Sequence, residues 1–317
     1  MTVISPDLVT LELVRQARQR TAAMVQPTPL VPAPWLHANA WLKLECFQTT
    51  GSFKLRGAAA CLSLLPPGTG VLAVSAGNHG LAVAHAAAAL GLPATIVVPA
   101  SASPAKVEAI RRYPATLLQR GADYDEAEAL ARPLAVELGL RFVSPYNDAD
   151  VIAGQGTLAL ELLEQQPDLE AIIIPSGGGG LLAGVAIAAQ ALKPGLVIYG
   201  AEPTGSPTME RALAHGGLHR IQEQPTLADG LAGNIEAGAI TFPLLAGRVQ
   251  EVVLVTEREI RQAMRAAAYH EHLMLEGSAA VALAAATKLG DTGQRTAVVL
   301  TGRNVALPLF LEVMASS

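Results

Sequence analysis

Cysteine, aromatic residues and charge are all scarce in this sequence. Its 317 residues include only 2 cysteines, with 4% aromatic and 15% charged residues. Cys46 and Cys61 form neither a C-x-x-C pair nor the cysteine and histidine spacing of a zinc site, which argues against a disulfide framework and a structural metal. We therefore expect a chain that works in a reducing compartment, namely the cytoplasm.

A basic surface and a membrane segment are also missing. The formal net charge is −5 at pH 7, and without a basic stripe interleaved with aromatic residues no nucleic-acid partner is expected. The segment Met1 to Arg15 lacks the basic start and apolar centre of a signal peptide. The apolar stretches Val71 to Ala100 and Ile172 to Leu192 are interrupted by polar residues or glycine before they reach membrane-spanning length. No membrane partner is expected.

What the sequence does contain is an alternation of short β-rich runs with helical stretches. Apolar strands that alternate with helices are typical of parallel sheets covered on both faces, so we predict an α/β protein, and the chain length favours two domains. The predicted strands are Trp41 to Glu45, Val71 to Ser75, Ala94 to Pro99, Thr116 to Arg120, Ala171 to Pro175, Val197 to Ala201, Glu251 to Thr256 and Thr296 to Thr301. The predicted helices are Ser52 to Leu65, Asn78 to Leu90, Pro104 to Tyr113, Tyr124 to Leu138, Gly156 to Gln165, Leu181 to Leu192, Arg258 to Met274 and the alanine-rich Ala279 to Ala286.

Three of the predicted strands are followed by loops rich in glycine, serine or threonine. These loops are Ser75 to Gly80, Pro175 to Gly180 and Thr301 to Asn304. In open α/β sheets, ligands bind outside the carboxyl ends of the strands, where all three loops would lie. We therefore predict one shared site.

A lysine stands at the start of a predicted helix in the segment Thr49 to Ala58. The positive end of the helix dipole disfavours the ammonium form of Lys54 and favours the neutral amine that a Schiff base needs. An isolated lysine in a sequence is usually a solvated surface residue. The functional interpretation of Lys54 therefore depends on the rest of the site.

That context comes from a run of glycines at Gly177, Gly178, Gly179 and Gly180, between an apolar strand and an apolar helix. Bare N–H groups at a helix N-terminus form a cradle for phosphate, and glycine lets the anion approach closely. The same run also fits a dinucleotide-binding G-x-G-x-x-A pattern, with Glu202 about twenty residues further on. A Rossmann protein would leave Lys54 and the Asn78 loop without a role.

The sequence resembles the pyridoxal-phosphate enzymes of the threonine/serine dehydratase and serine racemase family along nearly its whole length. The resemblance implies the two-domain α/β fold of type II, like that of the tryptophan synthase β subunit. It implies a smaller domain at residues 44–144 and a larger, cofactor-binding domain at residues 1–43 and 145–317. The motifs that carry it are Gly51 to Ala58, Ser75 to Gly80, Ser176 to Leu181, Gly154 to Thr157, Ala228 to Gly230, Leu275 to Gly277 and Thr301 to Asn304.

Carried over position by position, the resemblance implies a role for each loop. Lys54 would be the Schiff-base lysine and the acid and base for the α-proton of the substrate. The cofactor would be held by Phe53, Lys54, Asn78, Gly177, Gly178, Gly179, Gly180, Leu181 and Thr301, with Asn78 donating to the phenolate oxygen and Thr301 facing the pyridine nitrogen. The substrate carboxylate would be received by Ser75, Ala76, Gly77, Asn78 and His79. For Ser75 and Asn78, a helix cap is the simpler structural interpretation.

The implied reaction is the removal of water and ammonia from L-threonine or L-serine to give a 2-oxo acid. A neutral Thr301 hydroxyl makes the ring a weaker electron sink than an aspartate would, which favours prompt loss of a β-leaving group. Serine racemases of this family carry a second serine where this chain has Ala76, so racemisation would lack its second acid. A racemase stays an alternative with less support.

Three positions depart from the family pattern or have two interpretations. Relatives bind a divalent cation near Glu202 with an acidic residue where this chain has Thr208, so no metal is expected. Arg303 replaces a glycine and adds charge near the cofactor or an acidic substrate group, unless it forms a surface salt bridge. Another β-hydroxy amino acid, such as hydroxyaspartate or one from hydroxyectoine breakdown, therefore stays open as substrate. Glu276 is expected either at the pocket floor or in a buried structural pair.

The resemblance also implies a homodimer or homotetramer and a small amino-acid substrate as the only other partner. A ligand-binding protein with this scaffold and no catalysis is the remaining alternative. Lys54 distinguishes the two, because a binder does not need a lysine at the cofactor aldehyde.

Overall fold

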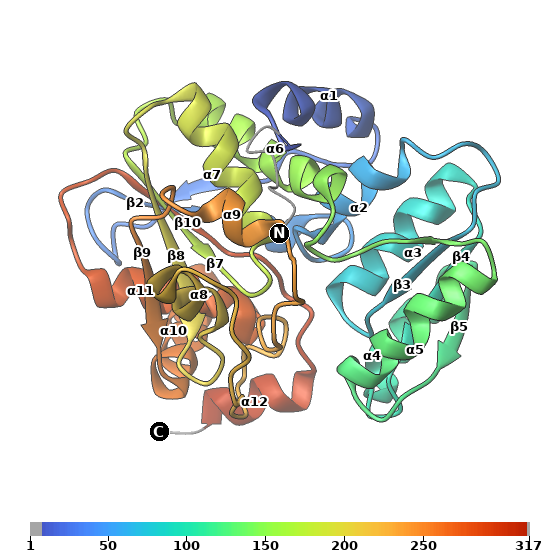
Figure 1. Ribbon diagram of the computed structural model, residues 1–317. Helices are drawn as coiled ribbons and strands as arrows, with labels where there is room; N and C mark the ends of the chain where they lie inside the picture. Colours follow the sequence, from blue (N-terminus) through green and yellow to red (C-terminus); the bar gives the residue numbers. More distant parts are fainter. Residues whose placement is uncertain (1–7, 316–317) are drawn as a thin grey trace.

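The fold is built on two separate β-sheets, seen in a computed structural model that describes residues 8–315 (Figure 1). The six-stranded sheet has the order β1-β2-β10-β7-β8-β9 and the four-stranded sheet the order β5-β4-β3-β6. All neighbours are parallel except β1 and β2, which are antiparallel. The strands are β1 Leu30–Pro32, β2 Ala40–Lys43, β3 Val71–Val74, β4 Ala94–Val98, β5 Ala115–Gln119, β6 Arg141–Phe142, β7 Ala171–Pro175, β8 Val197–Pro203, β9 Glu251–Val255 and β10 Thr296–Val299.

Helices cover both faces of each sheet, as the alternating sequence predicted. They are α1 Leu11–Thr21, α2 Lys54–Leu62, α3 Asn78–Leu90, α4 Pro104–Arg111, α5 Tyr124–Glu137, α6 Ala149–Gln165, α7 Gly180–Leu192, α8 Thr208–His215, α9 Thr241–Leu245, α10 Glu257–Glu271, α11 Gly277–Leu289 and α12 Leu307–Ala315, with a short 3₁₀ turn, η2, at Glu45–Phe47. Within residues 8–315 every helix is too short or too polar to cross a bilayer. The first seven residues of the segment Met1 to Arg15 lie outside the described part.

Side-chain alternation along the strands divides the hydrophobic core into layers. In β7, Ile172 and Ile174 pack with α1, α6 and α7, whereas Ile173 packs with α10 and α11 on the opposite face. In β3, Val71 packs with α2 and α3, whereas Leu72 packs with α5. A strand alternates its side chains between two faces, so a continuously apolar strand requires a helical layer on each side.

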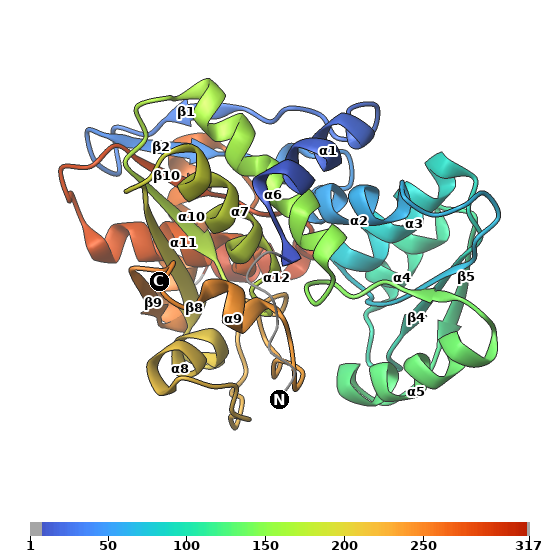
Figure 2. The ribbon, with the colours of Figure 1, turned by 45° about the horizontal axis from the view of Figure 1, so that its top comes forward.

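Helices α2 and α6 lie between the two sheets in both views (Figure 2). The start of α6 was predicted at Gly156, but the helix begins at Ala149, where Asp148 caps it by accepting from the N–H groups of Asp150 and Val151. Glycine inside the helix misled that prediction. A Cβ at Gly154 would lie 2.5 Å from the carbonyl oxygen of Arg56, so glycine allows α6 to pack closely against α2, the helix that begins at Lys54.

Candidate active site

The three predicted loops line a single cavity of about 830 Å³ at the carboxyl ends of β3, β7 and β10. Every residue predicted for the cofactor or the substrate lines it: Phe53, Lys54, Ser75, Ala76, Gly77, Asn78, His79, Gly177, Gly178, Gly179, Gly180, Leu181 and Thr301. The loops follow strands of both sheets, so the cavity lies where the two sheets meet. Its size suits a cofactor together with a small substrate.

Lys54 is the first residue of α2, and its side chain is half-buried in the wall of the cavity. Its Nζ donates to the carbonyl oxygen of Pro145 at 3.2 Å and lies 5.1 Å from the ring centre of Phe53. Burial lowers the pKa of Lys54 to about 8, and the nearby charge of Glu276 opposes that shift. The helix dipole was expected to lower the pKa of Lys54, whereas desolvation is the main cause in the structure. Either cause yields a larger fraction of neutral amine near pH 7.

Backbone pairing fixes the position of Lys54 relative to the loop after β10. The N–H of Phe53 donates to the carbonyl oxygen of Thr301 at 3.0 Å, and Ser52 forms an antiparallel bridge with Gly302. Thr301 itself is 3% exposed and lines the cavity. These contacts hold the amine and the Thr301 hydroxyl on walls of the same cavity.

The glycine run forms the turn between β7 and α7, and side chains would not fit there. Gly179 has φ +84°, which favours glycine, and a Cβ on Gly178 would lie 2.3 Å from the ring of Tyr146. A Cβ on Gly180 would lie 2.9 Å from the backbone of the same tyrosine. The loop thus presents bare backbone at the N-terminus of α7, where the first N–H groups of a helix lack intrahelical partners.

The loop after β3 begins α3 with Gly77 as the N-cap, and no side chain caps the helix. Ser75 Oγ accepts from the N–H of Gly77 at 3.0 Å. The side chain of Asn78 is not a cap, because its amide binds Glu276 and Asn304 instead. His79 donates through Nε2 to the carbonyl oxygen of Val143 at 2.8 Å, and burial lowers its pKa to about 3. His79 therefore stays neutral near pH 7.

Glu276 is a pocket carboxylate with close partners. Its Oε1 accepts from Asn78 Nδ2 at 2.7 Å and its Oε2 from the backbone N–H of Asn304 at 3.1 Å. Burial raises the pKa of Glu276 to about 7. Both interpretations of Glu276 are thus partly right, because it lines the cavity and is also paired.

Arg303 does not line the cavity, contrary to the expectation of a charge near the cofactor. Its side chain is exposed, and its guanidinium lies 5.3 Å from the ring centre of Phe47. The backbone explains this orientation, because the N–H of Arg303 donates to the carbonyl oxygen of Gly51 and the neighbouring Asn304 faces inward. No role in binding the phosphate or an acidic substrate follows from this position.

Glu202 is fully buried and serves the start of α8. Its oxygens accept from the N–H groups of Met209 at 3.0 Å and Glu210 at 2.9 Å, and Thr208 Oγ1 lies 3.5 Å away. Burial raises the pKa of Glu202 to about 8. With both oxygens engaged below the helix, this carboxylate is not free to bind a ribose, which removes support from the dinucleotide alternative.

Sequence reasoning missed several residues of the cavity. Lys106 on α4 forms an ion pair of 2.6 Å with Asp229 across the opening, and Tyr146 supports the glycine loop. No local pattern indicates such contacts, since the ion pair joins residues 123 positions apart.

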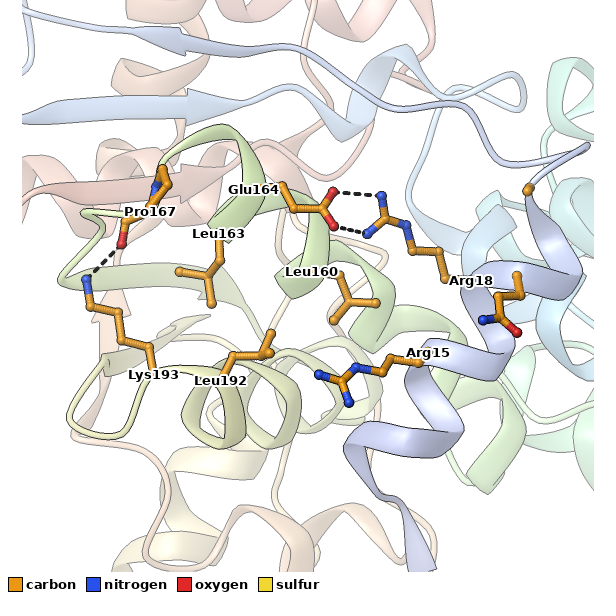
Figure 3. Close-up of a pocket in the computed structure, with 10 residues that line it drawn as sticks. Arg15, Arg18, Leu160, Leu163, Glu164, Pro167, Leu192 and Lys193 are labelled. Carbon is orange, nitrogen blue, oxygen red and sulfur yellow. Dashed lines mark hydrogen bonds and ion pairs between the residues drawn. The ribbon is translucent and has the colours of Figure 1, made fainter.

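A second cavity of about 780 Å³ lies between α1, α6 and the end of α7 (Figure 3). Arg18 forms a two-point ion pair with Glu164 there, and Lys193 donates to the carbonyl oxygen of Pro167 at 2.9 Å. The floor is formed by leucines, including Leu160 and Leu163. None of the three loops contributes to this cavity, so it is distinct from the candidate active site.

Comparison with known proteins agrees with this geometry. The chain is 39% identical to an L-threonine ammonia-lyase of Thermotoga maritima, covering 97% of this chain and 78% of the relative. It is 36% identical to an L-threo-3-hydroxyaspartate ammonia-lyase of a Pseudomonas species, covering 94% and 96%. The structure of maize serine racemase superposes with a TM-score of 0.91 at 33% identity, covering 97% of each chain. Residues 22–302 match the family described as pyridoxal-phosphate dependent enzyme, and the chain belongs to that family.

Proposed function

We propose that this chain is an ammonia-lyase that converts L-threonine, L-serine or both to a 2-oxo acid and ammonia. The observation that carries the proposal is that Lys54, an amine of lowered pKa, lines one cavity with the glycine loop and Thr301. The identity to a threonine ammonia-lyase over most of the chain supports the same reaction class. The net change is loss of the β-hydroxyl and the α-proton as water, followed by hydrolysis that releases ammonia.

The residues of the cavity fit pyridoxal phosphate. A Cβ at any position from Gly177 to Gly180 would lie 3.0 Å or less from neighbouring atoms, so backbone N–H groups form the surface offered to the phosphate. Lys54, Asn78 and Thr301 line the same cavity. Lys54 would supply the amine for the aldehyde, and Thr301 would offer a neutral hydroxyl to the ring nitrogen. When bound, the cofactor withdraws electrons from the α-carbon of the amino acid.

Each part of the cavity then has one role in the reaction. The substrate carboxylate is received at the N-terminus of α3, where Gly77 leaves the first N–H groups without a side-chain cap. Lys54 Nζ accepts the α-proton, which its lowered pKa of about 8 permits close to neutral pH. Thr301 would offer the ring nitrogen a neutral hydroxyl that cannot hold a proton there as an aspartate would, and this would favour release of the β-hydroxyl.

The charges around the cavity favour a substrate with a neutral side chain. Lys106, the lining lysine other than Lys54, is already paired with Asp229. The acidic residues that line the cavity are Asp123, Asp125, Glu223, Asp229 and Glu276. A second carboxylate on the substrate, as in hydroxyaspartate, would meet these charges without a free cation among the described lining residues. Threonine and serine avoid that repulsion.

Serine racemase activity has less support for a different reason. Racemisation needs an acid on the face of the substrate opposite Lys54, and the loop after β3 offers Ala76 where racemases carry a serine. An alanine methyl carries no proton. Ser75 Oγ is one residue away, but it accepts from the N–H of Gly77 in the turn.

The wider organisation is also part of this proposal. We infer that residues 44–144, which contain the four-stranded sheet, form a smaller domain. This domain closes over substrate bound against the larger domain of residues 1–43 and 145–317. A homodimer or homotetramer in the cytoplasm fits the family. Size-exclusion chromatography with light scattering measures the assembly directly.

The test is an absorption spectrum of the purified protein before and after borohydride reduction, followed by peptide mapping and assays of oxo-acid formation. We expect a yellow protein, a phosphopyridoxyl group on Lys54, and turnover of L-threonine or L-serine above that of L-threo-3-hydroxyaspartate. A colourless protein that ignores added pyridoxal phosphate would remove the basis of the proposal. Preference for hydroxyaspartate, or substantial D-serine formed from L-serine, would replace the proposed reaction by one of its alternatives.

A further inference from the structure

Three segments far apart in the sequence meet at the side chain of Asn78. Glu276 precedes α11 and accepts from Asn78 Nδ2 at 2.7 Å. Asn304 follows β10, and its Nδ2 donates to Asn78 Oδ1 at 2.6 Å. The backbone N–H of Asn304 donates to the second oxygen of Glu276 at 3.1 Å, which closes a ring of hydrogen bonds among the three residues.

The ring leaves each amide only one orientation. Asn304 Nδ2 also donates to the carbonyl oxygen of Thr50 at 2.9 Å, and a carbonyl oxygen only accepts. Both N–H bonds of Asn304 are thereby used, and Asn78 must present its oxygen to them. The carboxylate of Glu276 then takes one N–H of Asn78. One N–H of Asn78 then remains for a ligand in the cavity that this residue lines.

Only a carboxylate at position 276 satisfies both neighbours. Glu276 accepts one hydrogen bond on each oxygen, from Asn78 and from Asn304. A glutamine has a single oxygen, so its NH₂ group would face one of these donors. The backbone opposite is shaped for the carboxylate, because a Cβ on Gly302 would lie 2.3 Å from Oε1 of Glu276.

We propose that Glu276 is a positioning residue: its carboxylate, together with Asn304, orients the Asn78 amide so that a fixed N–H donor points at the phenolic oxygen of the bound cofactor. This inference rests on the proposed function, because it assumes that pyridoxal phosphate occupies the cavity. Without the carboxylate, the Asn78 amide can turn its oxygen towards the cofactor. The hydrogen bond to the phenolic oxygen is then replaced by repulsion between two oxygen atoms.

The charge of Glu276 acts on the same site. The charged or titratable groups that face it are Lys54, Asp229, Lys106 and Cys46. Burial and Asp229 raise the pKa of Glu276 to about 7, whereas Asn78, Asn304 and Lys106 favour its ionised form. Protonation below that pH adds a donor where Asn78 needs an acceptor. The cofactor environment should therefore change around neutral pH.

The test compares Glu276→Gln with Glu202→Gln, a matched control whose carboxylate is also buried and also accepts two N–H groups, both from the backbone and outside the cavity. Apoprotein is titrated with pyridoxal phosphate, and the visible absorption of each holoprotein is followed from pH 5.5 to 8.5. For Glu276→Gln we expect a Kd raised about tenfold, the size of one misdirected hydrogen bond. We also expect the absorption change near pH 7 to be lost. Glu202→Gln should match the wild type in both.

Asn304→Ala provides a second, independent variant that removes the other restraint on the amide while keeping Glu276. It should weaken cofactor binding similarly, and the two changes together should cost less than the product of the single effects, because either one releases Asn78. If Glu276→Gln does not fold, the cofactor affinity of Asn304→Ala tests the proposed orientation of Asn78. Wild-type affinity in a folded Glu276→Gln or Asn304→Ala protein, or an absorption change near pH 7 that persists in Glu276→Gln, would overturn this inference alone. Failure of the wild type to bind the cofactor would overturn the proposed function.

Discussion

Replacing Lys54 by methionine should stabilise the cofactor-free protein. Burial lowers the pKa of Lys54 from the ordinary 10.5 to about 8, so below pH 8 the folded state holds an ammonium ion that water would solvate better. At 1.36 kcal/mol per pKa unit, that cost is about 3 kcal/mol. The hydrogen bond from Nζ to the carbonyl oxygen of Pro145 offsets about 1 kcal/mol. Lys54→Met should therefore gain about 2 kcal/mol at pH 7.

The sign of the pH dependence follows from the lowered pKa. Because the folded state releases the proton of Lys54 before the unfolded state does, the full cost applies below pH 8 and fades between pH 8 and 10.5 as the unfolded lysine also becomes neutral. The gain from Lys54→Met should shrink over the same range.

The assay is urea unfolding of both apoproteins at pH 7 and pH 10, with Lys193→Met as the control. Lys193 donates to the carbonyl oxygen of Pro167 at 2.9 Å, but its side chain is only partly buried and this hydrogen bond is open to solvent. Its replacement should change the free energy of unfolding by less than about 0.5 kcal/mol at either pH. A Lys54→Met protein no more stable than the wild type at pH 7, or equally stabilised at pH 10, would refute the claim that burial suppresses the ammonium form.

Three further predictions concern the phosphate loop, the cleft and the metal question. Gly178→Ala places a methyl group 2.3 Å from the Tyr146 ring. It should raise the Kd for pyridoxal phosphate more than about tenfold in an absorption titration, and an unchanged Kd would contradict the close packing. Arg132→Glu breaks an ion pair of 2.6 Å between Arg132 on α5 and Glu236 in the segment before α9. It should raise KM about threefold, with recovery in the double variant that adds Glu236→Arg. KM left unmoved by either change would exclude a role in closure. Dialysis against a chelator should leave turnover unchanged, because Glu202 already caps α8; activity restored by magnesium would show otherwise.

The main elements of the fold could be predicted because each follows from a local pattern. Apolar strands such as β7 must be covered on both faces, and a run of glycines between a strand and a helix indicates an anion site. The comparisons confirm the α/β fold and the cofactor. The roles of the individual site residues stay predictions, although the structure brings all of them to one cavity.

Features that depend on contacts between residues far apart in the sequence could not be predicted. The strands β1 and β6 have 3 and 2 residues and depend on pairing with β2 and β3. The start of α6 was predicted too late because Gly154 lies inside the helix. A glycine is required there by the close approach of the Arg56 backbone. The orientation of Arg303 depends on the backbone at Gly51, and its charge alone suggested the wrong direction.

Helix α2 carries both the proposed catalytic lysine, Lys54, and a buried arginine, Arg56, that anchors the helix by ion pairs. Two residues apart on a helix, their side chains point in different directions. Arg56 is buried between two carboxylates, Glu45 at 2.7 Å and Glu161 at 2.8 Å, and these hold its pKa above the ordinary value. Lys54 has no ion pair within residues 8–315, since Glu276 is engaged by Asn78 and Asn304. A carboxylate in direct contact would keep Lys54 protonated and useless as a base, so the charges that anchor α2 must lie on the face away from the cavity.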